Sequence, residues 1–309
     1  MTYFSVIIPL YNKENFVEAT IQSALNQTFI DFEIIVINDG STDKSAEKVS
    51  QITDSRIQLL TTENQGVSAT RNLGIEKASG KMIAFLDADD YWFPNHLQNL
   101  FELGEMFPEQ KVFANAIQVQ TGKKIFNATY SIPVTPKIQL LNFFNASLDQ
   151  AVLFTSATAV DRRFLKQLGG FDETLKTDED TDLWIRIGLE SLVVFNQNIG
   201  VKYNFDSKGL SKNTSFFVQK TDFSKYQNLE KTNPALAQFL SIHRFSIALK
   251  SKISGNKEQY IRFNNLISKD LLSKKQRLLL NLPPTLLRFI FSTKIFLERF
   301  SIRLSAFKR

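Results

Sequence analysis

Cysteine is absent from this 309-residue chain, and histidine occurs only twice. A chain without cysteine has no disulfide, no thiol nucleophile and no thiolate metal ligand, as is typical of proteins from reducing compartments. His96 and His243 cannot by themselves form a histidine-rich zinc site. The composition therefore excludes several common catalytic and metal-binding chemistries.

Long hydrophobic runs are also lacking. No stretch of about eighteen apolar residues occurs, so we predict no transmembrane span. The first nine residues have neither a basic start nor a long apolar segment, and we predict a first strand there instead of a signal peptide. We therefore expect the protein in the cytoplasm or at the inner face of the cell membrane.

Basic charge is concentrated at one end of the chain. The net charge of +6 arises from +12 in residues 241–309 and −6 in the residues before them. With 43% hydrophobic and 12% aromatic residues, the chain can bury a full core. We expect one large domain at 1–215, followed by a basic helical region at 216–309.

Apolar runs and helical patterns alternate near the N-terminus. The predicted strands are 4–10, 32–38, 57–61 and 82–86, and the predicted helices are 16–27, 44–53 and 67–78. Such alternation predicts a doubly wound, mostly parallel α/β sheet flanked by helices. Ligands bind these sheets outside the carboxyl ends of the strands, where polar residues follow each strand here.

The polar strand ends predict a single binding site. Alternate residues of an extended segment share a face, so Asp87 and Asp89 emerge together and repel by about 4 kcal/mol near a protein surface. A divalent cation removes this repulsion, and Mg²⁺ or Mn²⁺ commonly binds through one or two carboxylates together with substrate phosphates. The alternative is that Asp89 and Asp90 cap a helix that starts near Asn95.

The other strand ends suggest contacts to a nucleotide. Tyr11 can stack on a base, Asp39 can accept hydrogen bonds from a base or ribose, and Arg71 can neutralise phosphate charge. Neither a dinucleotide-binding glycine motif nor a P-loop is present, so a metal-held nucleoside diphosphate fits best. Each residue also has a structural interpretation, as a core aromatic, a turn former before Gly40 or an exposed helix charge.

Four motifs follow one another in order: VIIPLYN at 6–12, NDGSTD at 38–43, NQGVSATRN at 64–72 and LDAD at 86–89. They resemble the successive motifs of family 2 glycosyltransferases with the GT-A fold, over roughly residues 2–215. The resemblance implies inverting transfer of a sugar from a nucleotide-sugar, usually a UDP-sugar, with Mn²⁺ or Mg²⁺ at the Asp-x-Asp motif. It implies that Asp89 binds the metal, and we expect Asn64 to contact the nucleotide. The other implied nucleotide contacts are Pro9, Tyr11, Asp39, Arg71 and Asp87.

A second acidic cluster, TDEDTDLWIR, occupies residues 177–186. An inverting displacement needs one base within hydrogen-bond reach of the acceptor hydroxyl. The Glu-Asp motif of the family implies that this base is Asp180, with Asp182 starting the following helix. The alternative assigns all four acids to the positive N-terminus of that helix, and we favour it for Asp178 and Asp182.

The remaining segments of the large domain are less informative. We predict an amphipathic helix within 90–107, a hairpin-like pair at 112–119 and 125–130, and a strand at 153–160. Many family members have a histidine where the nearest counterpart here is Asp206, which we interpret as a loop residue. Lys208 and Lys212 are candidate diphosphate contacts.

The basic C-terminal region is predicted to be helical, at 235–252, 257–268 and 285–307. In the last helix an apolar stripe is flanked by Arg288, Arg299 and Arg303, a pattern that suits an anionic membrane surface. The same stripe can instead pack on the catalytic domain or on a second subunit of a homo-oligomer. Nucleic acid is not an expected partner, since no recognition motif accompanies the charge.

We therefore expect an inverting, metal-dependent glycosyltransferase with a nucleotide-sugar donor. Its saccharide or lipid-linked acceptor would belong to cell-surface polysaccharide or glycolipid synthesis. The alternative is a non-catalytic nucleotide-sugar-binding or scaffold protein on the same fold, against which Glu179 and Asp180 argue. A nucleotidyltransferase is disfavoured, because no basic nucleotide-activation loop follows the first strand.

Overall fold

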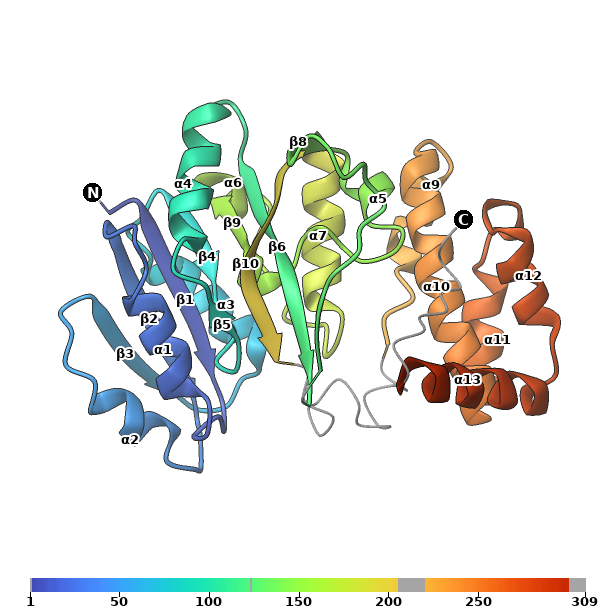
Figure 1. Ribbon diagram of the computed structural model, residues 1–309, viewed down its shortest axis with the longest axis horizontal. Coiled ribbons are helices and arrows are strands. Elements are labelled where there is room, and N and C mark those ends of the chain that lie inside the picture. The colour runs from blue at the N-terminus through green and yellow to red at the C-terminus, as the bar shows by residue number, and fades with distance from the viewer. Residues whose placement is uncertain (1, 123, 205–219, 300–309) are drawn as a thin grey trace. The chain divides into compact units, whose positions relative to one another are not determined.

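The computed structural model describes residues 2–122, 124–204 and 220–299 (Figure 1). The chain divides into two compact units. The first contains the elements from β1 (Phe4–Leu10) to β10 (Val193–Asn204), and the second those from η3 (Ser224–Tyr226) to α13 (Pro284–Arg299). The expected boundary at residue 215 lies outside the described residues, as do Asp206, Lys208 and Lys212.

The N-terminal half of the first unit alternates strands with helices. After β1 come α1 (Val17–Leu25), β2 (Phe32–Asp39), α2 (Ser45–Ser50), β3 (Ile57–Thr62), α3 (Val67–Lys77) and β4 (Met82–Phe85). Nearly every residue of β1 is buried, as expected for a central parallel strand with covered faces. Strands β2 and β4 both run parallel to β1, where Ile7 pairs with Ile35 on one side and Phe85 on the other.

The rest of the first unit departs from simple alternation. It contains β5 (Tyr91–Trp92), α4 (His96–Met106), β6 (Val112–Thr121), β7 (Lys124–Asn127), β8 (Ile138–Leu141), α5 (Phe143–Ala146), η1 (Thr155–Ala157), β9 (Thr158–Asp161), α6 (Arg162–Gln167), α7 (Glu179–Glu190) and β10. The sheet order is β3-β2-β1-β4-β9-β6-β10-β5, with β7 beside β6 and β8 beside β10. Strand β9 runs antiparallel to β4 and β6, so the sheet is mixed beyond β4. The predicted α/β sheet flanked by helices is confirmed (Figure 1).

Some predicted elements of this second half were wrong. The predicted strand 153–160 is a 3₁₀ turn followed by the short strand β9. The amphipathic helix expected within 90–107 is confirmed as α4, which starts at His96 after the short strand β5. The predicted hairpin corresponds to β6 and β7. Strand β10 was not predicted. Its apolar pattern is interrupted at Asn196, where its register with β6 shifts. Such an irregularity breaks the alternation of apolar and polar residues by which a strand is predicted.

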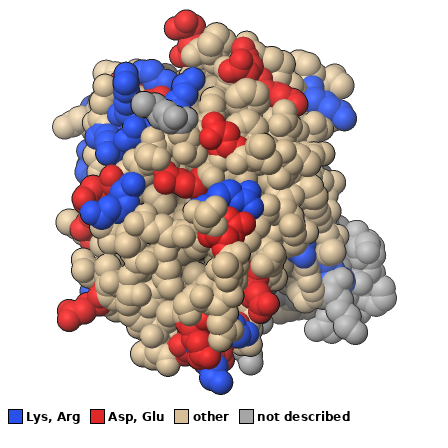
Figure 2. All heavy atoms as spheres, turned by 90° about the vertical axis from the view of Figure 1, so that its left-hand side faces the viewer, with Lys and Arg blue, Asp and Glu red and all other residues tan. Residues whose placement is uncertain are grey.

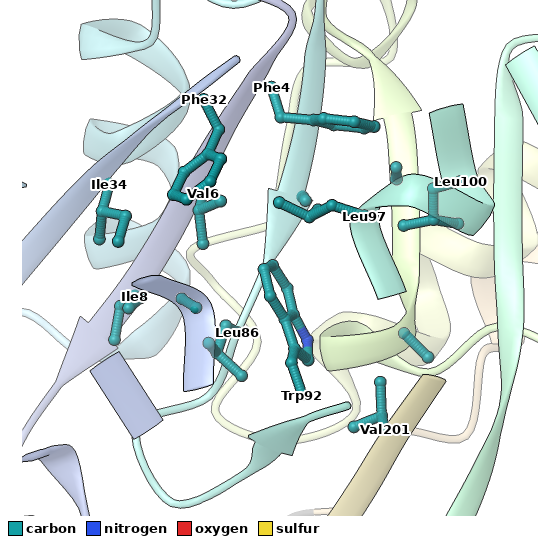
Figure 3. Close-up of a cluster of buried hydrophobic side chains, with 14 of the residues drawn as sticks. Phe4, Val6, Ile8, Phe32, Ile34, Leu86, Trp92, Leu97, Leu100 and Val201 are labelled. Atoms are coloured by element: carbon teal, nitrogen blue, oxygen red, sulfur yellow. The ribbon is translucent and has the colours of Figure 1, made fainter. Parts of the chain in front are cut away.

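A hydrophobic cluster anchors the segment that follows β4. Figure 3 shows Trp92 close to Leu86 and Leu97 within this cluster. Trp92 is 1% exposed, and its indole N–H donates to the Ser156 carbonyl over 2.6 Å. Burial of such a large side chain contributes about 1.5–3 kcal/mol. The acidic segment between Leu86 and Trp92 is therefore fixed at both of its ends by buried side chains.

The second unit is helical and has an apolar core of its own. Its elements are η3, α9 (Gln227–Glu230), α10 (Pro234–Ser254), α11 (Lys257–Asn265), η4 (Lys269–Leu271), α12 (Lys274–Asn281) and α13. Phe245, Phe263 and Leu287 are fully buried in this core. Helices α10 and α11 correspond to predicted helices, whereas α12 was not predicted. Arg303 of the last predicted helix lies outside the described residues. No helix in the described ranges is both long and apolar enough to cross a membrane.

Both signs of charge occur on the surface of the first unit. The face that looks out from the side of β3 and α2 carries basic and acidic side chains near one another (Figure 2). This mixture agrees with the modest net charge of −6 for residues 1–240. The excess of basic residues belongs to the C-terminal part of the sequence.

Candidate active site

The loop after β1 is bound to the loop after β2. Asn12 Oδ1 accepts the Thr42 N–H over 2.8 Å, and the Asn12 N–H donates to Ser41 Oγ over 3.1 Å. Asn12 has a φ of 51°, a left-handed conformation that asparagine adopts more readily than most residues. Tyr11, just before this turn, is 44% exposed, and Pro9 is partly buried within β1. Tyr11 is thus a surface residue at the strand end and not the core aromatic of the structural alternative.

Asp39 at the end of β2 holds the loop after β3. Its two carboxylate oxygens accept the N–H groups of Gln65 and Gly66 over 2.8 and 2.9 Å. The side-chain amide of Asn64 donates to the Asp39 carbonyl over 3.0 Å. Gly40 permits this approach, because it has a φ of +67° and a Cβ there would lie 3.0 Å from the Asn64 nitrogen. The structure brings Asp39 and Asn64 together, while their contacts to a nucleotide stay a prediction.

Arg71 connects the two acidic clusters. Its Nη2 lies 2.7 Å from Asp87 Oδ1, its Nη1 lies 3.0 Å from Glu179 Oε1, and its guanidinium stacks over the ring of Phe171. Burial alone would lower the pKa of Arg71, but the carboxylates of Asp87 and Glu179 outweigh burial and raise it. Arg71 is only 4% exposed, so the interpretation of this residue as an exposed helix charge was wrong.

Asp89 forms an ion pair with Lys13, a residue that was not predicted to belong to the site. Lys13 Nζ lies 2.5 Å from Asp89 Oδ2. Burial raises the pKa of Asp89, the ammonium of Lys13 opposes this rise, and the nearby charge of Asp87 adds to it. The carboxylates of Asp87 and Asp89 are therefore close enough to repel, as their alternate positions predict. Each is paired with a different basic side chain, Asp87 with Arg71 and Asp89 with Lys13.

Asp90 joins the end of β4 to η1 and β10. Its carboxylate accepts the Ser156 hydroxyl over 2.6 Å and the Asn204 N–H over 3.2 Å. Burial, together with the charge of Asp87, raises the pKa of Asp90 well above its ordinary value. The helix-capping alternative was wrong, because Asn95 occupies the cap position of α4 and Asp90 bonds elsewhere.

Asp180 lies in the first turn of α7, which begins at Glu179 and not at Asp182 as predicted. Its side chain is partly exposed, and Oδ1 accepts the Thr181 N–H over 2.6 Å. Burial and the neighbouring Glu179 carboxylate raise the pKa of Asp180 to about 6, with Arg71 opposing the rise. A carboxylate with this pKa is mostly ionised at neutral pH and still accepts a proton readily, as a general base must.

Asp182 stabilises α7 itself. Its carboxylate is fully buried and lies 2.9 Å from the Nε of Arg186, one helical turn later. The Asp182 N–H donates to the Asp178 carbonyl over 2.9 Å, which continues the helix from its first turn. The two acids at positions 180 and 182 are therefore in different environments, although they share one short segment.

Two further residues of the site were not predicted. Tyr203, near the end of β10, packs on Phe154 with ring centroids 4.9 Å apart, and burial and then the carboxylates of both acidic clusters raise the pKa of Tyr203. Asn72 accepts the Phe171 N–H over 2.8 Å and donates to the Phe171 carbonyl over 2.9 Å. Phe171 is 99 positions from Asn72, so no local pattern could have shown this contact.

The donor set at the end of β4 fits a metal ion shared with a substrate. Within the described residues, no group of three or more His, Asp or Glu side chains forms a complete metal site. The Asp89 side chain is 22% exposed and provides hard oxygen ligands. Mg²⁺ and Mn²⁺ characteristically complete their coordination with substrate phosphates and water. Asp89, with Asp87 beside it, can therefore hold such a cation together with a diphosphate.

The fold and the polar strand ends define a GT-A domain, whose Asp-x-Asp segment follows β4. The family model described as "Glycosyl transferase family 2" matches residues 5–169, just over half of the chain. The chain belongs to this family.

Named relatives agree with this assignment. An uncharacterized glycosyltransferase of Rickettsia bellii (strain RML369-C) is 33% identical over 244 residues, which cover 77% of this chain and 32% of the relative. The Escherichia coli UDP-Glc:alpha-D-GlcNAc-diphosphoundecaprenol beta-1,3-glucosyltransferase WfaP is 32% identical over 201 residues, or 64% of this chain and 75% of the relative. The chain spans about a third of the length of the Rickettsia bellii relative.

A solved structure shows the same fold. The crystal structure of S. aureus TarS 1-349 in complex with UDP-GlcNAc matches with a TM-score of 0.70, at 19% sequence identity. The match covers 98% of this chain and 93% of the TarS chain. At this level of identity the likeness concerns the fold alone.

Proposed function

We propose that this protein transfers a sugar from a UDP-sugar to a hydroxyl of a lipid-linked saccharide, with inversion at the anomeric carbon and with Mn²⁺ or Mg²⁺. The observation that carries the proposal is the bridge of Arg71 between Asp87 and Glu179, which joins the predicted donor site to the segment of Asp180. The names of WfaP and of the TarS complex support a uridine nucleotide, and that of WfaP supports a diphosphoundecaprenol-linked acceptor.

The residues of the site have different roles in this reaction. Asp180 takes the proton of the acceptor hydroxyl, whose oxygen then bonds to the anomeric carbon while the bond from that carbon to the diphosphate breaks. The pKa of about 6 leaves Asp180 largely ionised for this step at neutral pH. Tyr11 and Asp39 position the nucleoside, and Asp89 with Asp87 holds the cation. When bound, the cation neutralises charge on the departing diphosphate.

The donor and the reaction can be tested in sequence. UDP-, GDP- and dTDP-sugars are first compared by thermal shift with and without Mn²⁺, and the best donor is then offered with a diphosphoundecaprenol-linked GlcNAc acceptor. We expect a UDP-sugar to stabilise the protein when Mn²⁺ is present, by about 2.7 kcal/mol at a hundred times its Kd. We then expect a product with inverted anomeric configuration. Donor binding without transfer or hydrolysis above background would favour the non-catalytic alternative.

We further infer that the C-terminal unit contacts an acidic membrane surface. Helix α12 exposes Lys274, Lys275 and Arg277 beside Leu278, which is 60% exposed, and Phe289 of α13 is 69% exposed. Basic side chains next to exposed apolar ones suit anionic lipids, where a lipid-linked acceptor resides. Co-sedimentation with vesicles should require anionic lipid and weaken at high salt. Self-association without vesicle binding would favour the second-subunit alternative.

A further inference from the structure

The loop after β1 presents Lys13 to Asp89. Their side chains form an ion pair of 2.5 Å across 76 positions of sequence. The Lys13 N–H donates to Ser45 Oγ over 2.7 Å, and its carbonyl accepts the N–H groups of Phe16 and Val17. The backbone of Lys13 is therefore fixed, while its long and flexible side chain is 31% exposed.

Each of the three carboxylates after β4 has a side-chain partner. Arg71 pairs with Asp87, and the Ser156 hydroxyl binds Asp90. Lys13 pairs with Asp89 itself. A divalent cation that takes Asp89 as its ligand must displace the ammonium or bind beside it against like-charge repulsion. This arrangement disfavours the binding of a cation by itself.

A nucleoside diphosphate changes the balance, because its phosphate oxygens offer the ammonium another anionic partner. We propose that Lys13 leaves Asp89 for the diphosphate when donor and cation bind together, and so makes the binding of each depend on the other. This inference rests on the proposed metal site at Asp89. By linkage the effect is reciprocal, so the nucleotide tightens the binding of the cation by the same factor as the cation tightens that of the nucleotide.

The variant Lys13→Gln separates this role from a merely structural one. Two affinities are measured on the full chain: that of Mn²⁺ without nucleotide, from the electron paramagnetic resonance signal of free Mn²⁺, and that of UDP at saturating Mn²⁺, by calorimetry. We expect Mn²⁺ alone to bind about tenfold tighter to the variant and UDP to bind about tenfold weaker. A merely structural role of Lys13 would weaken both.

Two more variants serve as controls. Lys13→Arg keeps the positive charge, so Mn²⁺ alone should bind it as weakly as it binds the wild type. Lys44→Gln removes an exposed lysine from the neighbouring loop and should leave both affinities unchanged.

The outcomes distinguish this inference from the proposed function. If wild-type protein binds no Mn²⁺ even with UDP, the metal site at Asp89 is refuted, and the role of Lys13 with it. If wild-type protein binds Mn²⁺ with UDP but Lys13→Gln matches it in both affinities, only the role of Lys13 is refuted. Weakening of both affinities in Lys13→Gln would likewise overturn the coupling.

Discussion

The two acidic clusters of the first unit are alike in composition but differ in how their charges are balanced. After β4, each carboxylate has a defined partner: Arg71 for Asp87, Lys13 for Asp89, and the Ser156 hydroxyl for Asp90. At the start of α7, Glu179 pairs with Arg71 and Asp182 with Arg186. Asp180 accepts hydrogen bonds from Thr181 but forms no ion pair within the described part of the chain.

This difference suggests that one cluster binds the donor and the other transfers the proton. Asp87 and Asp89 already have cationic partners and can exchange them for the charges of a ligand, which suits binding of a metal-held diphosphate. Asp180 is partly exposed, forms no ion pair with a described residue and has a raised pKa, which suits the transfer of a proton. Changing one acid at a time can test whether the two clusters really separate binding from proton transfer.

The largest effect is expected from Asp180→Asn. The amide cannot accept the hydroxyl proton, so kcat should fall by about 10²–10⁴-fold while UDP affinity stays unchanged. Initial rates of transfer and calorimetry with UDP measure the two quantities. Glu190→Gln, which changes an exposed acid at the far end of α7, is the matched control and should behave like the wild type. Full activity of Asp180→Asn would remove the proposed base.

A somewhat smaller loss of rate is expected from Asp89→Asn, by about 10²–10³-fold, since cation binding at the diphosphate is worth several kcal/mol. Unlike Asp180→Asn, this variant should also lose the part of UDP affinity that depends on Mn²⁺. Calorimetry with and without Mn²⁺ makes the comparison. If both variants lose UDP binding equally, the separation between the clusters does not hold.

The pH dependence of the wild-type enzyme should report Asp180. The base acts only when ionised, so kcat/KM should rise with pH, by about tenfold per unit below the pKa, and level off above about 6. Below that pKa the carboxyl is protonated and activity is lost. Rates measured across this range with donor and acceptor give the apparent pKa, and a profile that is flat through it contradicts the assignment.

The smallest effect is expected from Ser156→Ala, which acts on stability. Its hydroxyl donates to Asp90 and accepts the Asp87 N–H over 3.1 Å, so its loss leaves buried polar groups unsatisfied. We expect the free energy of unfolding to fall by about 1–3 kcal/mol in a urea titration. Ser50→Ala, at an exposed serine of α2, should cost less than about 0.5 kcal/mol. Equal losses in the two variants would show that Ser156 does not support the cluster.

The sequence by itself determined the first four strands, their polar ends and the family resemblance. Strands buried on both faces leave continuous apolar runs, and in parallel sheets the carboxyl ends of alternating βα units lie at one edge. These are local signals, so Tyr11, Asp39, Asn64, Asp87 and Asp89 could all be proposed before the fold was known.

Only the tertiary structure decided which charges meet. The pairing of Lys13 with Asp89 depends on β1 lying beside β4, and that of Arg71 with Glu179 joins residues 108 positions apart. Strand β10, interrupted by a register shift, brings Tyr203 to the same carboxylates. A side chain's charge partner and burial are long-range properties of the folded chain, and they set the pKa of Asp180, which its neighbours in sequence alone could not reveal.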